Sequence, residues 1–289
     1  MNIFLSLAVV VWSCHATVIY DINDAENLFE EFIKEYSKVY ESDMENLKNL
    51  CTTKFAGYIF ISSFLFLGIN QFSDLTKEEF AAQYKGLKFP AIPKQYLCPV
   101  IKKDADIPDA HVPNSWDWRT QNVLTPIKNQ GGCGSCWAFS TIATVESAHA
   151  HKHKELVSLS EQQVVDCDDT CSGCGVVFNI SYTGGSDPEK DYPYAGQQGT
   201  CLFKPKNAKV KVKTCTSYNL KSSDKVKQLL YANGPIGIIS VAGCDEGPLD
   251  HAVNLVGYGS GETFYIIASI TIAPFISSSF QPKDVHCWA

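Results

Sequence analysis

The chain has 289 residues, of which 45% are hydrophobic and 19% charged, and its formal net charge is −7. This length accommodates one sizeable core, or two lobes preceded by a leader. The acidic balance and the lack of a long basic run argue against a phosphate-neutralising surface, so no nucleic-acid partner is expected.

The first sixteen residues, "MNIFLSLAVVVWSCHA", are typical of a secretory signal peptide. An apolar run from Ile3 to Trp12 precedes small and polar residues, and Ala16 is the expected cleavage position. The run is about half of the roughly 20 residues that a membrane span needs, so no stable span is expected. Export implies an oxidising compartment, and the twelve cysteines are therefore interpreted first as disulfides.

Two helices are predicted in the segment that follows. The stretch after Asp24, a suitable N-cap, places apolar side chains on one helical stripe, namely Leu28, Phe29, Phe32, Ile33 and Tyr36. A second helix is expected to start at Thr76, with Glu79 three residues on. Between them, the apolar residues 55–69 are too few to span a membrane comfortably and are interpreted as a buried segment, with a membrane-associating segment as the alternative.

From residue 84 to 113 the sequence changes to lysines, prolines and isolated apolar residues, which predicts an extended, cleavable linker outside any core. Beyond it, "CWAFSTIATVESAHAHK" has helical periodicity, and "SLSEQQVVDC" predicts a second short helix capped by Ser158 or Ser160. Strands are predicted from Lys209 onward, in the stretches 209–215, 235–241, 251–259 and 263–272. Helices followed by strands indicate an α+β protein with two lobes.

The stretch "NQGGCGSCWAFS", residues 129–140, carries two cysteines three positions apart. Together with Cys171 and Cys174, the pair Cys133 and Cys136 has the spacing of a zinc site, but it leads directly into a helix of buried type. A redox pair would require a βαβ setting, which the pattern lacks. Structural disulfides are the remaining interpretation that requires no special chemistry.

Cys136 differs from the other cysteines because it stands in the first turn of the predicted helix. Unsatisfied N–H groups and the helix dipole favour a thiolate at that position. His251 opens the apolar strand "HAVNLVGYG" and is a candidate base for such a nucleophile. His149 and His153 share a helix face, yet they lie at a polar helix end typical of a solvated surface, so neither a metal nor a cofactor is expected.

These stretches resemble the papain-like cysteine proteases, and the cathepsin L-like branch most of all. "CGSCW" matches the family's signature around its cysteine. In the same order along the chain, "VPNSWDWR" is similar to the mature N-terminus, "LSEQQVVDC" and "DYPYAG" to the helical lobe, and "GINQFSD" to the inhibitory propeptide. The resemblance implies a signal peptide over residues 1–16, a propeptide over 17–111 and a peptidase domain over 112–289.

The fold implied is α+β and papain-like, with a helical left lobe and a β-barrel-like right lobe after a mostly helical propeptide. By resemblance Cys136 is the nucleophile, His251 the general base and acid, and Gln130 the side-chain donor of the oxyanion hole. The resemblance also assigns substrate contacts to Gly134, Trp137 and Ala252, and disulfides to the pairs Cys133–Cys174 and Cys167–Cys201. Peptide or protein substrates, the chain's own propeptide and protein inhibitors of thiol proteases are the implied partners, and the lysosome or the extracellular space is the implied location.

The sequence departs from the family's pattern at four places. Ser269 stands where an asparagine normally orients the histidine, which costs roughly 1 to 3 kcal/mol, or about tenfold to hundredfold in rate. Val176 and Val177 replace two glycines of the substrate-binding wall. His251 follows Cys136 by about 115 residues rather than about 130 to 150. After Ile267 the closing strands of the right lobe are expected to be missing.

Two functions therefore remain open, along with a remote third of a metal-binding structural protein. One is a cysteine endopeptidase made as a zymogen. The other is a catalytically impaired homologue, a pseudoenzyme or mis-spliced product that acts at most as a binding module. The intact Cys136, His251 and Gln130 favour the first, and the valine pair and the missing asparagine favour the second. The pairing of Cys171, Cys215, Cys244 and Cys287 and the glycosylation of Asn179 remain unassigned.

Overall fold

The computed structural model describes residues 25–39, 72, 74, 75, 79, 84, 98–168, 185–220, 222–240, 251–259, 264–269, 272–277 and 286–288. The predicted signal peptide, the apolar stretch 55–69, the valine pair and Asn179 lie outside these residues. The chain divides into two compact units, residues 1–74 and 75–289, and each is considered by itself.

The first unit contains the amphipathic helix α1, Ala25–Glu35. Phe29 and Phe32 are buried, and Ile33 and Tyr36 pack against them, so the predicted stripe is the buried face of the helix. The predicted cap, Asp24, lies outside the described residues. An ion pair between Lys38 and Asp74, 3.0 Å from nitrogen to oxygen, joins the end of this segment to the last residue of the unit.

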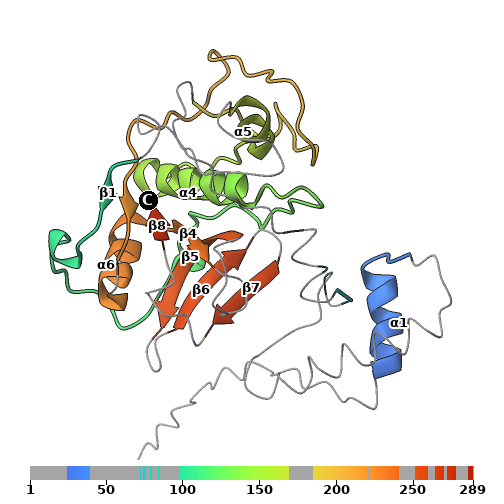
Figure 1. The fold of residues 1–289 in the computed structure, drawn as a ribbon, viewed down its shortest axis with the longest axis horizontal. Helices are drawn as coiled ribbons and strands as arrows, with labels where there is room; N and C mark the ends of the chain where they lie inside the picture. The colour runs from blue at the N-terminus through green and yellow to red at the C-terminus, as the bar shows by residue number, and fades with distance from the viewer. Residues whose placement is uncertain are drawn as a thin grey trace, which may run out of the picture. The chain divides into compact units, whose positions relative to one another are not determined.

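Three α-helices are described in the second unit. α4, Cys136–His153, runs alongside the sheet and lies between it and α5, Glu161–Cys167 (Figure 1). Ser160 rather than Ser158 is the N-cap of α5, because its hydroxyl accepts a hydrogen bond from the Gln163 N–H at 2.9 Å. α6, Ser223–Asn233, is a helix that the periodicity did not indicate.

The strands form one mixed sheet with the order β1-β3-β8-β4-β5-β6-β7, and β2 pairs with β5. Its long strands are antiparallel neighbours: β4 (Ile236–Ser240), β5 (His251–Gly259), β6 (Phe264–Ser269) and β7 (Ile272–Ser277). The shorter ones are β1 (Val100–Ile101), β2 (Trp116–Asp117), β3 (Ser217–Tyr218) and β8 (His286–Trp288). The described strands do not close into a barrel.

The sheet differs from the sequence-based expectation at two places. Residues 209–215 do not form a strand, since only an isolated bridge joins Val210 to Ser186 and the first paired residues are those of β3. The closing strands expected to be missing after Ile267 are supplied in part by the chain's last residues, because β7 pairs with β6 and β8 lies between β3 and β4. The C-terminal segment thus completes the hydrogen bonding of β4.

Residues 98–113, the continuously described part of the predicted extended linker, also contribute to the sheet. β1 pairs with β3, a 3-10 helix spans Asp104–Asp106, and Ile107 is buried in the main hydrophobic cluster. A further 3-10 helix, Trp118–Gln121, follows β2. The prolines within residues 98–113 therefore do not keep this part of the chain out of the core.

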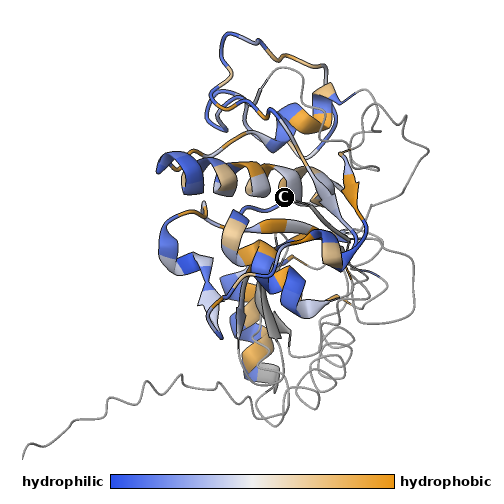
Figure 2. Cartoon of the chain, turned by 90° about the vertical axis from the view of Figure 1, so that its left-hand side faces the viewer, coloured by the Kyte–Doolittle hydropathy of each residue, from blue (hydrophilic) through white to orange (hydrophobic). Residues whose placement is uncertain are grey.

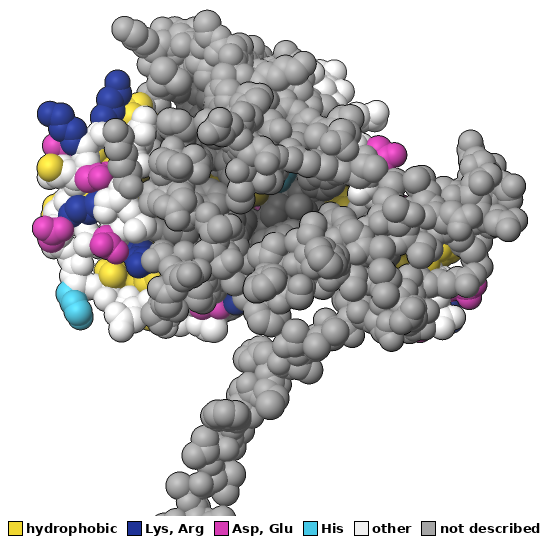
Figure 3. All heavy atoms as spheres, turned by 60° about the horizontal axis from the view of Figure 1, so that its bottom comes forward, with side chains coloured by type: hydrophobic (Ala, Val, Ile, Leu, Met, Phe, Trp, Pro, Cys, Tyr) yellow, Lys and Arg dark blue, Asp and Glu magenta, His cyan; other side chains and the backbone are white. Residues whose placement is uncertain are grey.

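Hydrophobic residues concentrate on the strands and central helices of the second unit (Figure 2). On the described surface, acidic and basic side chains are intermixed (Figure 3), as expected for a chain of modest negative charge. Among the described helices, none is both long enough and apolar enough to cross a membrane.

Candidate active site

The predicted nucleophile lies at the start of the buried helix α4. Cys136 is the first residue of α4, is fully buried and retains its thiol. The turn before it is tight: Ser135 N–H donates to the Cys133 carbonyl at 2.7 Å, and the Ser135 carbonyl accepts from Ala138 N–H at 2.9 Å. The first backbone N–H groups of this 18-residue helix lie at the end that carries the Cys136 thiol, and they favour its thiolate form.

The predicted base lies at the start of the strand that packs on this helix. His251 opens β5 and is 4% exposed, and its neighbour Ala252 shares a hydrophobic cluster with Cys136. Hydrogen bonds join the two elements near their starts. Ser140 Oγ donates to the Val253 carbonyl at 3.0 Å, and Asn254 Nδ2 donates to the Ser140 carbonyl at 3.1 Å. These contacts fix the longitudinal position of β5 against α4, and so place the first residues of both elements in one region.

Gln130 occupies the loop before α4 with its side-chain amide fully buried. Its Nε2 donates to two carbonyl oxygens, that of Cys133 at 2.8 Å and that of Tyr84 at 3.0 Å. The first bond holds the amide to its own loop. The second directs the remaining N–H at the carbonyl oxygen of a residue 46 positions earlier, within the predicted propeptide. The side chain thus donates to two peptide carbonyl oxygens, while its role as the oxyanion donor stays a prediction.

Tyr194 fixes this loop, a role that the sequence did not suggest although "DYPYAG" contains the residue. Its hydroxyl donates to the Gln130 carbonyl at 2.8 Å and lies 2.6 Å from the Ser135 hydroxyl. Its ring meets Phe139 of α4 edge to face at 4.8 Å. Burial raises the pKa of the Tyr194 phenol to about 12, so the hydroxyl remains a proton donor at any physiological pH.

The residues predicted to contact substrate lie beside the same helix start. Gly134 is buried in the loop, Trp137 is the second residue of α4 and is fully buried, and Ala252 follows His251. Ser269 is the last residue of β6, and Ala268 before it pairs with Asn254. Because β5 and β6 are antiparallel, the end of β6 lies beside the start of β5. The backbone of Ser269 is therefore near the end of β5 at which His251 stands.

The cysteines answer the question raised by the CxxC spacing. Cys133 is disulfide-bonded, so it is not available as a zinc ligand, whereas Cys136 retains a thiol. The predicted partner of Cys133, Cys174, lies outside the described residues, and that pairing stays a prediction. A disulfide joins Cys167 to Cys201, the pair that the resemblance implies. A further disulfide, between Cys98 and Cys215, was not expected.

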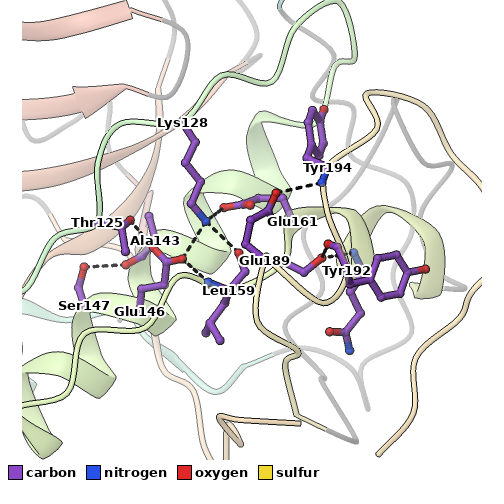
Figure 4. Close-up of polar contacts among 12 residues, drawn as sticks. Thr125, Lys128, Ala143, Glu146, Ser147, Leu159, Glu161, Glu189, Tyr192 and Tyr194 are labelled. Carbon is purple, nitrogen blue, oxygen red and sulfur yellow. Dashed lines mark hydrogen bonds and ion pairs between the residues drawn. The ribbon is translucent and has the colours of Figure 1, made fainter. Parts of the chain in front are cut away.

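A buried ion cluster holds the Gln130 loop to both helices (Figure 4). Lys128 Nζ donates to Glu146 Oε1 of α4 at 2.8 Å, to Glu161 Oε1 of α5 at 2.7 Å and to the Leu159 carbonyl at 2.8 Å. Glu146 also accepts from the Thr125 hydroxyl at 2.6 Å and from Leu159 N–H at 2.7 Å. One ammonium therefore links the loop, α4, α5 and the turn between the helices.

The cluster contains more acid than base. Glu189 approaches Glu161 and accepts from Tyr194 N–H at 2.9 Å, so three carboxyl groups face the single ammonium of Lys128 (Figure 4). Burial raises the pKa of Glu161 to about 8, against the lowering effect of Lys128, and the Glu146 charge raises it further. Burial likewise raises the pKa of Glu189. At least one carboxyl of the cluster therefore keeps its proton near neutral pH.

The raised pKa of Glu161 predicts a stability that depends on pH. Its ordinary pKa is 4.5, so between about pH 5 and about pH 8 the folded state holds a proton that the unfolded chain has released. This contribution to stability is complete below the ordinary pKa and is lost as the pH rises toward 8. In Glu161→Gln the midpoint of thermal unfolding is expected to fall less than in the wild type over this range. Parallel curves for the two proteins would contradict the prediction.

The site has the arrangement of a thiol-dependent hydrolase. A buried helix begins with a cysteine, a strand packed on it begins with a histidine, and a side-chain amide donates to a peptide carbonyl. The family described as papain family cysteine protease matches residues 112–269. The chain is 37% identical over 278 residues to the viral cathepsin of Epiphyas postvittana nucleopolyhedrovirus, covering 86% of this chain and 83% of the relative. It is 39% identical over 264 residues to the viral cathepsin of Rachiplusia ou multiple nucleopolyhedrovirus (strain R1), covering 83% of this chain and 80% of the relative.

Solved structures agree with this assignment. The digestive procathepsin L2 of Tenebrio molitor larval midgut has the same fold at a TM-score of 0.79 with 24% identity, covering 91% of this chain and 98% of that one. Recombinant stem bromelain precursor gives a TM-score of 0.69 with 27% identity, covering 91% of this chain and 97% of that one. The chain belongs to the papain family of cysteine proteases, as the motifs predicted, and the viral cathepsins are among the proteins that it is similar to.

Proposed function

We propose that the chain is a cysteine endopeptidase made as a zymogen. The Cys136 thiolate attacks the carbonyl carbon of a peptide bond, and Gln130 Nε2 and the Cys136 backbone N–H stabilise the oxyanion. The His251 imidazolium then gives its proton to the leaving amine, which departs with the new amino terminus. Water, deprotonated by the same imidazole, hydrolyses the thioester and restores the thiolate. The position of Cys136 at the start of α4 and of His251 at the start of β5 supports this assignment.

The observation that carries this proposal is the hydrogen bond from Gln130 Nε2 to the Tyr84 carbonyl. A donor intended for a substrate carbonyl binds a carbonyl of the chain's own predicted propeptide, residues 17–111. This supports self-inhibition by a propeptide that occupies the oxyanion donor before processing. The similarity to a procathepsin and to a bromelain precursor supports the same interpretation, as does the start of the family match at Val112.

The substrates proposed are peptides and proteins, with protein inhibitors of thiol proteases as further partners. The predicted signal peptide and the described disulfides support entry into the secretory pathway, with the lysosome or the extracellular space as the destination.

Labelling with a peptidyl electrophile that reacts with active-site thiols tests the proposal. The full chain is expected to react poorly because its propeptide occupies the site. After cleavage near residues 105–113 and removal of the propeptide under reducing conditions, the same protein is expected to react at Cys136 and to hydrolyse a fluorogenic peptide. The proposal fails if the processed protein, folded by thermal melting, neither reacts nor turns over substrate.

A catalytically impaired homologue is the second candidate, and the end of β6 favours it. Ser269 lies where the resemblance expects the asparagine that orients the histidine, at the end of the strand pair from which β5 starts. A serine side chain is shorter and lacks the carbonyl oxygen of an amide. Such a protein would keep the fold and bind an inhibitor protein without turning over substrate.

The substitution Ser269→Asn separates the two candidates. If the missing hydrogen bond limits catalysis, restoring the amide is expected to raise kcat by about tenfold to hundredfold, the value of one hydrogen bond of roughly 1 to 3 kcal/mol. The matched control is Ser277→Asn, at the end of β7, which should leave kcat unchanged. Equal rates for Ser269→Asn and the wild type would show that this position does not limit turnover.

A further inference from the structure

The segment before the predicted processing point is an edge strand of the peptidase sheet. Its two-residue strand β1, Val100–Ile101, pairs in parallel with β3, Ser217–Tyr218. The backbone N–H of Ser217 donates to the Pro99 carbonyl at 2.8 Å, and that of Asn219 donates to the Ile101 carbonyl at 2.9 Å. β1 extends a sheet whose other members all come from residues beyond Val112. The final part of the predicted propeptide is therefore built into the catalytic unit.

A covalent bond reinforces this pairing. Cys98, two residues before the start of β1, forms a disulfide with Cys215, two residues before the start of β3, across 117 residues of sequence. Cys98 is 8% exposed. The bridge joins a residue of the predicted propeptide to one of the predicted peptidase domain, so cutting the backbone between them does not separate the two parts.

The same segment is anchored a second time after β1. Ile107 is 7% exposed and belongs to the main hydrophobic cluster. Lys225 of α6 donates to the Ile107 carbonyl at 2.7 Å and to the Asp109 carboxylate at 2.6 Å. The Lys225 contact lowers the pKa of Asp109, so its carboxylate is ionised at neutral pH.

Around the Asp109 contact the residues are exposed to solvent. Residues 108–111, "PDAH", are all exposed, whereas Val112 packs against the cluster on their C-terminal side. An exposed stretch between two packed residues is where a protease reaches the chain most readily. It also falls inside residues 84–113, the stretch that the sequence predicts to be a cleavable linker.

We propose that cleavage in residues 108–111 leaves the propeptide covalently attached through Cys98–Cys215, and that a dithiol reductant completes activation by releasing it. This inference rests on the proposed function, since it describes the same zymogen. A thiolate of the reductant attacks one sulfur of the bridge and displaces the other as a thiolate. The reductant's second thiol then resolves the mixed disulfide, so one dithiol is oxidised while Cys98 and Cys215 are each reduced to a thiol.

The attachment matters because it makes rebinding intramolecular. A cleaved but untethered inhibitor is lost by dilution, while a tethered one keeps an effective concentration set by the length of its link, in the millimolar range for short links. Between Cys98 and Tyr84, whose carbonyl accepts from Gln130, only a short stretch of chain intervenes. Tethering is worth about 10² to 10⁴ in apparent affinity by this mechanism. The cut protein therefore stays inhibited until the bridge is reduced.

The covalent link is tested without any need for activity. The full chain with Cys136→Ser is digested with a trace of a broad-specificity protease, alkylated, and separated with and without dithiothreitol, and the ends are read by mass spectrometry. Material cut in residues 108–111 is expected to migrate as one species without reductant and as two with it. In Cys98→Ser the two fragments are expected to separate without reductant. Separation of the wild-type fragments without reductant, or their retention in Cys98→Ser, would overturn the proposal.

The regulatory consequence is tested on active protein. Wild type and Cys98→Ser, each cut in the same way, are assayed on a fluorogenic peptide with and without dithiothreitol. Because both carry Cys136, any effect of the reductant on that thiol is common to them. The reductant is expected to stimulate the wild type about 10²-fold more than the variant.

Equal stimulation of the two proteins would overturn the inhibitory role of the tether. If neither protein hydrolyses the peptide under any condition, the proposed function fails, while the electrophoretic result still decides whether the tether exists. Should Cys98→Ser not fold, the wild-type digest with and without reductant remains decisive for the covalent link.

Discussion

Cys136→Ala is expected to lower kcat/KM for peptide hydrolysis by about 10⁴-fold or more, because removal of a nucleophile leaves only the contribution of binding and the oxyanion donors. The measurement uses processed protein and a peptide with an apolar residue one before the residue at the scissile bond. Labelling by the thiol-directed electrophile should disappear together with turnover.

A matched substitution on the same helix controls for damage to the fold. Lys152 is exposed near the opposite end of α4, and Lys152→Ala should leave both turnover and labelling unchanged. Persistence of hydrolysis in Cys136→Ala at the wild-type rate would mean that another group attacks the substrate, and it would remove the chemical basis of the proposed mechanism.

Lys128→Met is expected to reduce the free energy of unfolding by about 3 to 5 kcal/mol, the usual result of removing one partner of a buried ion pair. Glu146 and Glu161 have side chains 1% and 2% exposed, and both lose their counter-charge in the variant. The loss should be largest above pH 8, because at lower pH Glu161 can keep its proton and partly offset the missing cation. Denaturant unfolding at pH 6 and pH 9 measures both effects.

The same substitution at a surface lysine supplies the control. Lys209 pairs with Glu155 at 2.7 Å, and the two side chains are 45% and 50% exposed, whereas the Lys128 side chain is 20% exposed. Surface substitutions of this kind change stability by about 0.5 kcal/mol or less. A loss in Lys128→Met no larger than that in Lys209→Met would mean that the cluster does not hold the loop, α4 and α5 together.

The candidate site was accessible from the sequence because its chemistry is encoded locally. Cys136 is recognisable from the glycines before it and the apolar period after it, and His251 from the strand it opens. The stripe of α1 and the cap of α5 follow from spacings of three and four residues, which is the scale on which a helix is made. The cap was nonetheless ambiguous between Ser158 and Ser160, since both precede the apolar run and only the hydrogen bond to Gln163 distinguishes them.

The failures have a common cause, which is that pairing across long separations leaves no local period. "KVKVKTC" alternates as a strand does, yet residues 209–215 lack a continuous neighbour and do not form a ladder. The residues after Ile267 were expected to lack the closing strands, yet β8 pairs with two strands that are distant in sequence, β3 and β4. Composition likewise suggested a free linker where β1 and Ile107 are anchored.

The sequence by itself determined the family and predicted the thiol of Cys136, the imidazole of His251 and the amide of Gln130, because each depends on residue types at short spacing. Only the tertiary structure decided that Gln130 donates to Tyr84, that Lys128 pairs with both Glu146 and Glu161, and that Cys98 is bonded to Cys215. These contacts join residues from 18 to 117 positions apart. Which distant groups meet depends on how the whole core packs, since a side chain's partner is set by the burial of its element and not by its neighbours in the chain.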